Sequence, residues 1–427
     1  MSSAVATRPL AAPAVSRAAA DASVRNGGRT ADAAPARRSV VIIPECFDDG
    51  TLTPCAYIRL LLPLDHPRIG AGLDVTLAPP GVPPERLRAD MIVTHRNAVA
   101  TTGQAQALVR HCRRSGITLV YDLDDDLLAL PPQHPDAARL APLAPAVGLL
   151  LAEADVVTVS TPALAAALAH RRPDAVVLPN GLDERLWADP PPARLRRGGS
   201  VRILYMGSQT HEADFALVVP ALERLLASFG PQIGFDMIGI SAGSVPGWVS
   251  RIGPPPTAAS YPGFVNWLVQ QGSWDIGIAP LAQGRVVQGR VVQGRGTQGR
   301  AGGRFNAGKS AIKALEYAAL GMATVASDGP AYRGSCADGA GGILVPNTEA
   351  AWCEALGRLV RDPGLRARLA AGGRDWLAAH GTLAAQEAAW RAAWGPDAAV
   401  GRNPRADAAP GRTLSAGAAA LRRRIRG

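Results

Sequence analysis

Residues 305–328 read "FNAGKSAIKALEYAALGMATVASD", and this stretch decides the fold class. Its first part has the apolar spacing of a helix that ends at Gly321, and "MATVASD" at 322–328 has the composition of a buried strand. A helix that leads directly into a buried strand is the repeating unit of a parallel α/β sheet covered on both faces. The same alternation extends in both directions along the chain.

Strand and helix patterns alternate over residues 39–187. Strands are expected at 39–45, 73–79, 89–96, 117–126, 155–161 and 175–183. Helices are expected within 55–64, at 102–116 with a glycine stop, at about 137–154, and after Thr161, which would cap a helix with Pro162 at its first position. We interpret this half as an N-terminal Rossmann-like domain.

A Pro/Gly-rich linker at 188–200 follows, and the pattern then restarts. Strands are expected at 201–208, 233–240, 274–281 and 322–328, and helices at 214–230, 308–320, 348–361, 363–379 and in a last run that reaches Trp394. The chain is therefore predicted to be α/β, with two Rossmann-like parallel-sheet domains, the second at 201–397. Ligands of such sheets bind at the carboxyl ends of the strands, so two facing domains imply a cleft between them.

Basic residues concentrate in three low-complexity pieces of the chain. Residues 1–38, 283–304 and 398–427 carry net charges of +4, +5 and +6, whereas the whole chain carries +10, so the remainder is mildly acidic. We expect the two terminal pieces to be disordered tails. No specific nucleic-acid partner is expected, because a nucleic-acid-binding domain carries its basic patch on the fold. The tails leave open a weak attraction to anionic lipid or nucleic acid.

The basic piece at 283–304 interrupts the second domain. It repeats Gln-Gly-Arg four times, with "VVQGR" in tandem. A period of five is too short for a solenoid repeat, and it indicates a surface loop expanded by replication slippage. RNA binding by an RGG-like segment is the alternative, although the aromatic residues of such segments are missing here.

The five cysteines show neither C-x-x-C spacing nor a clear pairing scheme, which indicates a reducing cytoplasm and argues against a zinc site. The sequence has no run of 18 or more apolar residues, and arginines interrupt the N-terminal segment where a secretory signal would be apolar. We expect a cytoplasmic protein, with peripheral association at the inner membrane left open.

Gly303, Gly308, Lys309 and Ser310 match the G-x-x-x-x-G-K-S pattern of a phosphate-binding P-loop. A P-loop needs a strand that runs directly into its first glycine. Here the expected strand ends at Leu281, and the repeat separates it from Gly303. No clear apolar strand ending in Asp follows at a suitable distance. A P-loop NTPase therefore remains only a remote alternative.

Lys309 and Lys313 are the two lysines of a chain whose other basic residues are all arginine. With Glu316 they fall near one face of the helix expected at 308–320. Lys309 is expected in its first turn, where the backbone N–H groups and the helix dipole favour an anion, and where a lysine can bind a diphosphate. A solvated Lys–Glu face is the plain alternative.

Two stretches carry a resemblance to a known family: "WDIGIAPL" at 274–281, and "FNAGKSAIKALEYAALGMATVASDGPAYR" at 305–333. They resemble the C-terminal domain of the bacterial group 1 (family 4) glycosyl transferases. "YMGSQTHEADFALVVPALERLL" resembles the start of the same domain, and "YDLDDDLL" and "VVLPNGLD" resemble the N-terminal domain. The resemblance covers about residues 39–395. It implies a GT-B fold and a retaining enzyme that uses a nucleotide-sugar donor.

The resemblance assigns roles in the second domain. Glu316 matches the second acid of the family's motif of two glutamates separated by seven residues, which contacts the donor's ribose. Gly308 stands where the first, sugar-contacting acid is expected. Asn306 and Lys309 would take over donor contacts, as in relatives that carry F-N-x-x-K-S.

The turn after the first strand of the second domain also departs from the family. Ser208, Gln209 and His211 stand where the family has Arg and Lys, which makes Lys309 more important for neutralising phosphate. Gly207 and Ser208 fit a tight turn that lets the backbone approach phosphates. The predicted donor-binding residues are thus Gly207, Ser208, Asn306, Lys309, Ser310, Lys313 and Glu316.

In the first domain, Tyr57, Arg59 and Asp124 are the acceptor-side candidates, and His95, at a strand end, is a catalytic candidate together with Glu316. A packed Tyr, a surface Arg and a structural His are their plain alternatives. The run Asp122-Leu123-Asp124-Asp125-Asp126 contains the Asp-x-Asp pattern that metal-dependent transferases of the single-domain GT-A fold use. Because two Rossmann-like halves do not fit one GT-A domain, we interpret these acids as a polar loop at the cleft and expect no metal.

The sequence thus predicts a glycosyl transferase of the hexosyltransferase type, retaining and metal-independent, without a cofactor other than its nucleotide-diphosphate sugar. Its acceptor would be a glycan or a lipid-linked molecule, as in cell-envelope polysaccharide synthesis. A non-catalytic sugar-nucleotide or glycan-binding protein on a GT-B scaffold is the alternative from a different class, because the first acid of the motif is missing.

Overall fold

The computed structural model describes residues 37–79, 81–132, 134–187, 199–239, 245–272, 274–282, 285–287, 290–292, 304–336, 341–396 and 398. Predictions for the two tails therefore lie outside the described residues, apart from Arg37, Arg38 and Ala398. The same holds for most of the 188–200 linker and of the 283–304 insert. None of the described helices is long and apolar enough to span a membrane.

The first half contains a six-stranded parallel sheet in the order β2-β1-β3-β4-β5-β6. Its strands are β1 (Arg38–Ile43), β2 (Leu73–Leu77), β3 (Met91–His95), β4 (Thr118–Leu123), β5 (Val156–Val159) and β6 (Val176–Val177). The second half repeats this arrangement in the order β14-β13-β10-β7-β8-β9. Its strands are β7 (Val201–Met206), β8 (Ile233–Ile238), β9 (Ser250–Ile252), β10 (Ile276–Ala279), β13 (Ala323–Ser327) and β14 (Gly342–Val345). The predicted α/β class with two Rossmann-like domains is confirmed.

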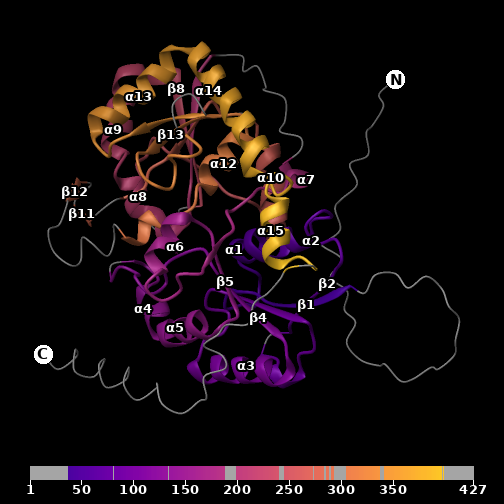
Figure 1. Cartoon of the computed structure of the whole chain (residues 1–427). Helices are drawn as coiled ribbons and strands as arrows, with labels where there is room; N and C mark the ends of the chain where they lie inside the picture. The colour runs from indigo at the N-terminus through magenta and orange to yellow at the C-terminus, as the bar shows by residue number, and fades with distance from the viewer. Residues whose placement is uncertain are drawn as a thin grey trace, which may run out of the picture.

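Helices cover both faces of each sheet. In the first half they are α1 (Pro54–Ala56), a π-helical segment (Tyr57–Leu61), α2 (Leu62–Asp65), α3 (Thr102–Ser115), α4 (Ala137–Leu140), α5 (Ala144–Glu153), α6 (Pro162–Leu168) and α7 (Glu184–Trp187). In the second half they are α8 (Glu212–Ala216), α9 (Val219–Phe229), α10 (Tyr261–Gln270), α12 (Ile312–Ala319), α13 (Glu349–Arg361), α14 (Pro363–Trp376) and α15 (Glu387–Trp394). Figure 1 shows the two halves stacked, with the first half in indigo and magenta and the second in pink, orange and yellow.

Capping residues, a glycine and prolines set the ends of several helices. The side chain of Thr101 accepts from the Gln104 N–H, and Gly116 ends α3 in the left-handed conformation at φ 69°. Thr161 caps α6, with Pro162 in its first turn. Prolines break two expected helices: 137–154 divides around a 3₁₀ turn at Ala141–Leu143, and 214–230 divides ahead of Pro220. The short β9, β14 and α10 were not expected.

The helix expected at 308–320 begins later than the sequence indicated. A separate helical turn covers residues 304–307, and α12 starts at Ile312. The Gly308 N–H bonds to the Phe305 carbonyl and the Lys309 N–H to the Asn306 carbonyl, both at 3.2 Å, so these groups complete the short turn. The placement of Lys309 in the first turn of the helix was therefore wrong, because Lys309 precedes that turn.

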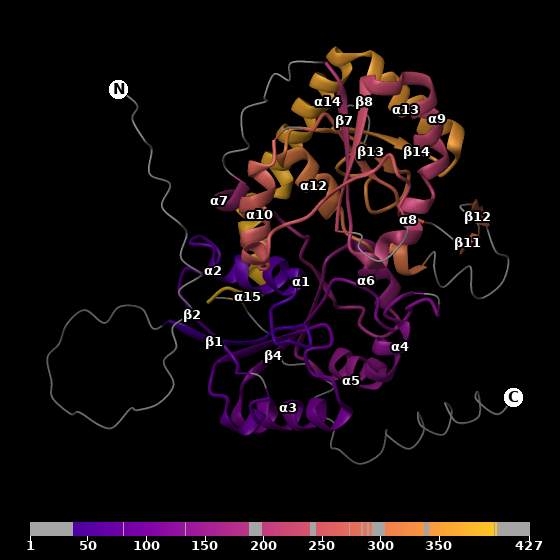
Figure 2. The ribbon, with the colours of Figure 1, turned by 180° about the vertical axis from the view of Figure 1, so that it is seen from behind.

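The repeat insert contains an antiparallel pair of short strands, β11 (Arg285–Val287) and β12 (Arg290–Val292). The hairpin stands beside the molecule, outside both sheets, and Figure 2 shows it on the side of α8 and α6. The described part of the insert thus adds no strand to either domain.

The C-terminal helix α15 returns to the first half, as the yellow ribbon in Figure 1 shows. The Arg391 side chain donates to the Arg68 carbonyl at 2.9 Å, and the Arg38 side chain donates to the Gly395 carbonyl at 2.9 Å. Trp390 is fully buried, and the Arg59 guanidinium lies 5.3 Å from its ring centre. One hydrophobic cluster includes Leu60 of the first half, Tyr317 of the second half and Trp390, so the two halves share a core.

Candidate functional site

A cavity of about 140 Å³ lies between the two halves, at the carboxyl ends of their strands. The first half contributes Cys55, Ile58, Asp124, Asp125 and Asn180, and the second contributes His211, Leu281, Lys309, Ser310, Ile312, Lys313 and Tyr332. Four predicted site residues therefore meet here: Asp124, Lys309, Ser310 and Lys313. They come from both domains, as expected for a cleft site.

Lys309 joins the two halves electrostatically. Its Nζ lies 3.0 Å from the Asp125 carboxylate of the first half and 4.5 Å from the centre of the Phe305 ring. The ion pair is half-buried, with 20% of the Lys309 and 14% of the Asp125 side chain exposed. The lysine of the second half is thus held at the cavity by a carboxylate of the first half.

Lys313 reaches the same cavity through a histidine. Its Nζ lies 3.3 Å from His211 Nε2, and His211 Nδ1 lies 2.7 Å from Asp214 Oδ2. An ammonium group has only donors, so Nε2 accepts and Nδ1 carries the proton that it donates to Asp214. The other oxygen of Asp214 accepts from the Ala282 N–H at 2.7 Å, which anchors the chain to the backbone.

Burial sets the charge states of Lys313 and His211. Burial, together with the neighbouring Lys313, lowers the pKa of His211 to about 4, so the ring is neutral at neutral pH. Burial also lowers the pKa of Lys313 to about 8, with the charge of Lys309 acting in the same direction and Asp214 opposing it. Lys313 therefore carries its charge at neutral pH but releases its proton far more readily than an exposed lysine.

Gly207 and Ser208 form the turn after β7, as predicted. The Gly207 N–H bonds to the Ile238 carbonyl at 3.0 Å, and a side chain at Gly239 would come within 2.4 Å of the Gly207 oxygen. The close approach of these two turns requires glycine at 239, where φ is +96°. Ser208 is exposed, its hydroxyl lies 2.7 Å from that of Thr210, and it does not line the cavity.

Asn306 and Glu316 support the cavity from behind. The Asn306 side chain donates to the Ala282 carbonyl at 2.6 Å, which ties the segment before α12 to the segment that follows β10. Glu316 is buried and accepts from the Tyr261 hydroxyl at 3.2 Å. Burial raises the pKa of Glu316 to about 7, even though the Tyr261 hydrogen bond and Lys313 favour the carboxylate.

Gly308 is covered by the first half of the molecule. Thr161 Oγ1 donates to the Gly308 carbonyl at 2.9 Å, and a Cβ at this position would lie 3.7 Å from Leu164 of α6. Beside it, the Asn180 side chain donates to Ser310 Oγ at 2.9 Å. The position where the family resemblance expects an acid thus faces helix α6.

Arg96 pairs with two acids of the cavity lining, and the sequence did not indicate it. It is the one described non-glycine residue with positive φ, at 49°, and the Tyr121 hydroxyl donates to its carbonyl at 2.7 Å. Its guanidinium pairs with Asp124, with Asp125 at 3.1 Å and with Glu45 at 3.1 Å. Burial alone would raise the pKa of Asp124, but Arg96 holds it below its ordinary value. A strained backbone at a charge cluster is typical of functional sites.

The structure places Arg59 and His95 away from the cavity lining. Both side chains are fully buried. Arg59 pairs with Asp122 at 2.6 Å, and Thr158 Oγ1 donates to the same carboxylate. His95 Nε2 lies 3.8 Å from Asp122, neither ring nitrogen has a hydrogen-bond partner among the described residues, and burial lowers the pKa of the ring.

The remaining acceptor-side candidate, Tyr57, lies in the π-helical segment and does not line the cavity. It is half-buried, and burial raises the pKa of its hydroxyl. The catalytic role of His95 and the acceptor roles of Tyr57 and Arg59 stay predictions, and each would require movement of these groups or of the halves.

Each acid of the Asp-rich run has a cationic partner. Asp122 pairs with Arg59, Asp124 with Arg96, Asp125 with Lys309, and Asp126 with Arg304 at 3.2 Å. Within the part of the chain that the structure describes, no group of three His, Cys, Asp or Glu side chains is placed to hold a metal ion. The acids thus serve as partners for cations, two of which come from the second half.

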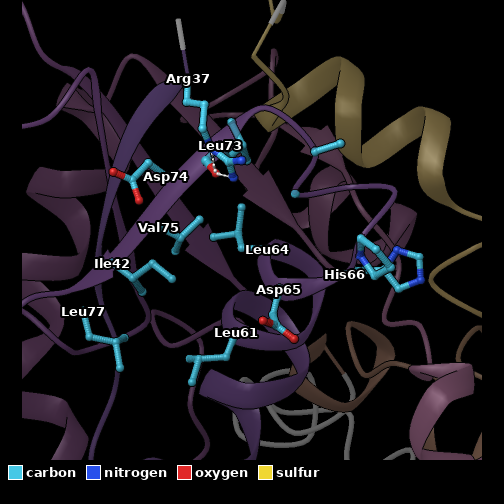
Figure 3. A pocket seen from close by; sticks show the side chains of 13 residues that line it. Arg37, Ile42, Leu61, Leu64, Asp65, His66, Leu73, Asp74, Val75 and Leu77 are labelled. Carbon is cyan, nitrogen blue, oxygen red and sulfur yellow. Dashed lines mark hydrogen bonds between the residues drawn. The ribbon is translucent and has the colours of Figure 1, made fainter. Parts of the chain in front are cut away.

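A further cavity of about 390 Å³ lies beside the edge strand β2 (Figure 3). Arg37, Asp65, His66 and Asp74 are the charged or polar side chains around it, and Arg37 donates to the Leu73 carbonyl. None of the predicted site residues lines this cavity, so it does not contribute to the candidate site.

No protein-family model matches this sequence, and no curated protein matches it either. Solved structures do resemble the fold. A sucrose-phosphate synthase from Thermosynechococcus elongatus aligns with a TM-score of 0.55 at 15% identity, over 82% of this chain and 97% of that one. Anabaena HepE in complex with UDP-glucose aligns with a TM-score of 0.55 at 14% identity, over 83% and 98%. A glycosyltransferase from Rickettsia africae aligns with a TM-score of 0.51 at 12% identity, over 82% and 96%. The chain therefore has the two-domain GT-B fold of these proteins.

The Asp125–Lys309 pair leads to a direct prediction about anion binding. In Asp125→Asn, Lys309 loses its competing carboxylate, so inorganic pyrophosphate should bind about tenfold more tightly, a change of ~1.4 kcal/mol. Isothermal titration calorimetry on the full chain measures this. The matched control is Asp126→Asn, whose partner is Arg304 rather than Lys309, and it should change the affinity less than about twofold. Equal or weaker binding in Asp125→Asn would contradict the competition.

Proposed function

We propose that this chain transfers a hexosyl group from a nucleotide-diphosphate sugar to a hydroxyl acceptor, with retention and without a metal ion. The observation that carries the proposal is the cavity between the two halves, on which both lysines of the chain converge. Departure of a nucleotide diphosphate develops negative charge, and stabilising that charge is the main electrostatic task of the reaction.

Lys309 and Lys313 are the groups proposed to hold the diphosphate. Lys313 is oriented by His211, which is in turn fixed by Asp214, so its ammonium group is aimed into the cavity before a ligand arrives. Such preorganisation makes the stabilisation stronger, because little reorientation is needed during the reaction. With two cationic side chains available, the proposal needs no divalent ion.

Asp125 is the group that the diphosphate is proposed to replace as the partner of Lys309. Without an anion it neutralises Lys309, and it already lies 3.1 Å from Arg96. A diphosphate carries more negative charge than one carboxylate, so it can take over Lys309 while Asp125 keeps Arg96 as its partner. After the exchange, Asp125 stays next to Arg96, the cation that it shares with Glu45 and Asp124.

The rest of the donor would extend from this point along α12 and the first half. Glu316 lies one turn beyond Lys313, and we propose that it contacts the ribose when the Tyr261 hydrogen bond opens. Because Gly308 supplies no carboxylate, the hydrogen-bonded Asn180 and Ser310 side chains in the cavity lining are proposed as sugar contacts in its place.

Two other observations bear on the reaction. Anabaena HepE, which has the same fold, was solved with UDP and with UDP-glucose, which supports a UDP-type donor. The sequence resemblance to the group 1 transferases supports the proposed retention, and it also supports a glycan or lipid-linked acceptor at the inner membrane face. The missing acid at Gly308 favours the second candidate, a binding protein without turnover.

Turnover separates the two candidates. The full chain is first screened by thermal shift against UDP-, GDP-, ADP- and dTDP-hexoses, and hydrolysis of the stabilising donor is then followed with EDTA present. We expect slow release of the nucleotide diphosphate, and Lys309→Ala should weaken binding of that nucleotide at least about tenfold, ~1.4 kcal/mol. The control Arg224→Ala removes an exposed cation of α9 and should change neither. Binding without turnover would support the binding protein, and no binding by any nucleotide sugar would refute both.

The pKa of Lys313 predicts how the affinity for the nucleotide diphosphate depends on pH. Its protonated form attracts the diphosphate, so affinity should be highest below pH 8 and should fall as the pH rises through about 8. For one group the dissociation constant rises by up to about tenfold per pH unit above that value. Titration of the nucleotide between pH 6.5 and 9.5 measures the slope. Lys313→Arg keeps its charge throughout and should remove the slope, whereas an unchanged slope would contradict the role of Lys313.

A further inference from the structure

A separate pocket of about 350 Å³ lies in the first half, at the carboxyl ends of β1, β2 and β3 and beside the start of α3. In the order β2-β1-β3-β4, β1 connects to the strand on one side while β3 connects to the strand on the other. Open parallel sheets bind ligands in the crevice where the connections diverge in this way. The topology therefore makes this pocket a candidate binding site of the first domain.

Most of the side chains that line the pocket are apolar, among them Ile43, Val82, Leu87 and Leu108. Small-molecule sites combine such a lining with a few polar groups that fix the orientation of the ligand. The volume is at the lower end of the range of such sites, about 300–1,000 Å³. It therefore suits a compact apolar body and is too small to enclose a long chain.

Three lining side chains carry acceptor oxygens: Glu45, Asn97 and Gln104, whose Oε1 accepts from the Thr101 N–H at 3.1 Å. Glu45 uses one oxygen, Oε2, both for the Thr53 hydroxyl at 3.2 Å and for Arg96 at 3.1 Å. Asn97 Oδ1 is buried and has no hydrogen-bond partner among the described residues. A buried acceptor without a donor is unfavourable, so a ligand hydroxyl that donates to it would be favoured.

The pocket is connected to the cavity between the halves by charged side chains. Glu45 lines the pocket, Arg96 pairs with Glu45 and with Asp125, and Asp125 lines the cavity. The ion pairs Glu45–Arg96 and Arg96–Asp125 thus connect a hydroxyl held beside Glu45 to the place proposed for the donor diphosphate. Arg96, in its strained backbone conformation, stands between the two.

We propose that this pocket holds the apolar part of the acceptor, so that the acceptor is a sugar or alcohol attached to a compact apolar group. The proposal rests on the proposed function, since it names the substrate that receives the hexosyl group. The apolar group fills the space between Val82 and Leu108, and the hydroxyl-bearing part meets Glu45 and Asn97. Affinity comes from the apolar group, and the polar residues orient the molecule.

Calorimetry on the full chain tests this with 4-nitrophenyl and methyl β-hexosides of glucose, galactose and mannose. For at least one sugar, the nitrophenyl glycoside should bind at least tenfold more tightly than its methyl counterpart. Ala98→Phe and Val82→Phe each fill the pocket and should abolish the preference. Ala100→Phe adds the same ring at an exposed position outside the pocket and should retain it.

Binding of UDP is measured on the same samples as the second readout. The proposal predicts UDP affinity within twofold of wild type in all three variants, which also shows that they are folded. Two results would overturn the acceptor pocket while leaving the proposed function standing. In the first, wild type binds UDP but does not prefer nitrophenyl over methyl glycosides. In the second, both Ala98→Phe and Val82→Phe bind UDP normally and keep that preference. If wild type bound neither UDP nor any nucleotide sugar of the thermal-shift panel, the proposed function would instead be refuted.

Discussion

The ion pair between Lys309 and Asp125 is the contact on which the site depends, because it links the two halves across the cavity. It is one of the polar contacts that residues 304–310, before α12, make with the first half. Arg304 pairs with Asp126, the Gly308 carbonyl accepts from Thr161, Lys309 pairs with Asp125, and Ser310 accepts from Asn180. A short segment of the second domain therefore sets how the first domain sits over it.

The charged groups of the cleft form two clusters, one in each half, and Lys309 lies between them. On one side, Arg96 holds Glu45, Asp124 and Asp125, and on the other, His211 and Asp214 hold Lys313. Lys309, like Arg304, belongs to the second domain but pairs with an acid of the first. In the proposed reaction this lysine leaves its carboxylate for the diphosphate, so binding of the donor would change the contact between the halves. The shared core around Trp390 would keep them together meanwhile.

The fold could be predicted from the sequence because parallel strands and their covering helices have strong apolar periods. The start of α12 could not, because Thr161 and Asn180 of the other half bind the backbone and side chain just before it. The scarcity of lysine pointed correctly to two residues of the cavity lining. The surroundings of Arg59 and His95 were not predictable, since they depend on Asp122 of β4 and on Trp390 of α15. Arg96 was hidden among many arginines, and only its positive φ and its three carboxylate partners single it out.

The central claim is that a diphosphate takes Lys309 from Asp125. A crystal structure of the full chain with bound UDP tests it most directly. The account predicts a phosphate oxygen within hydrogen-bond distance of Lys309 Nζ, with Asp125 bonded to Arg96 and no longer paired with the lysine. UDP bound elsewhere on the chain, or UDP in the cavity with the Lys309–Asp125 pair intact, would contradict it.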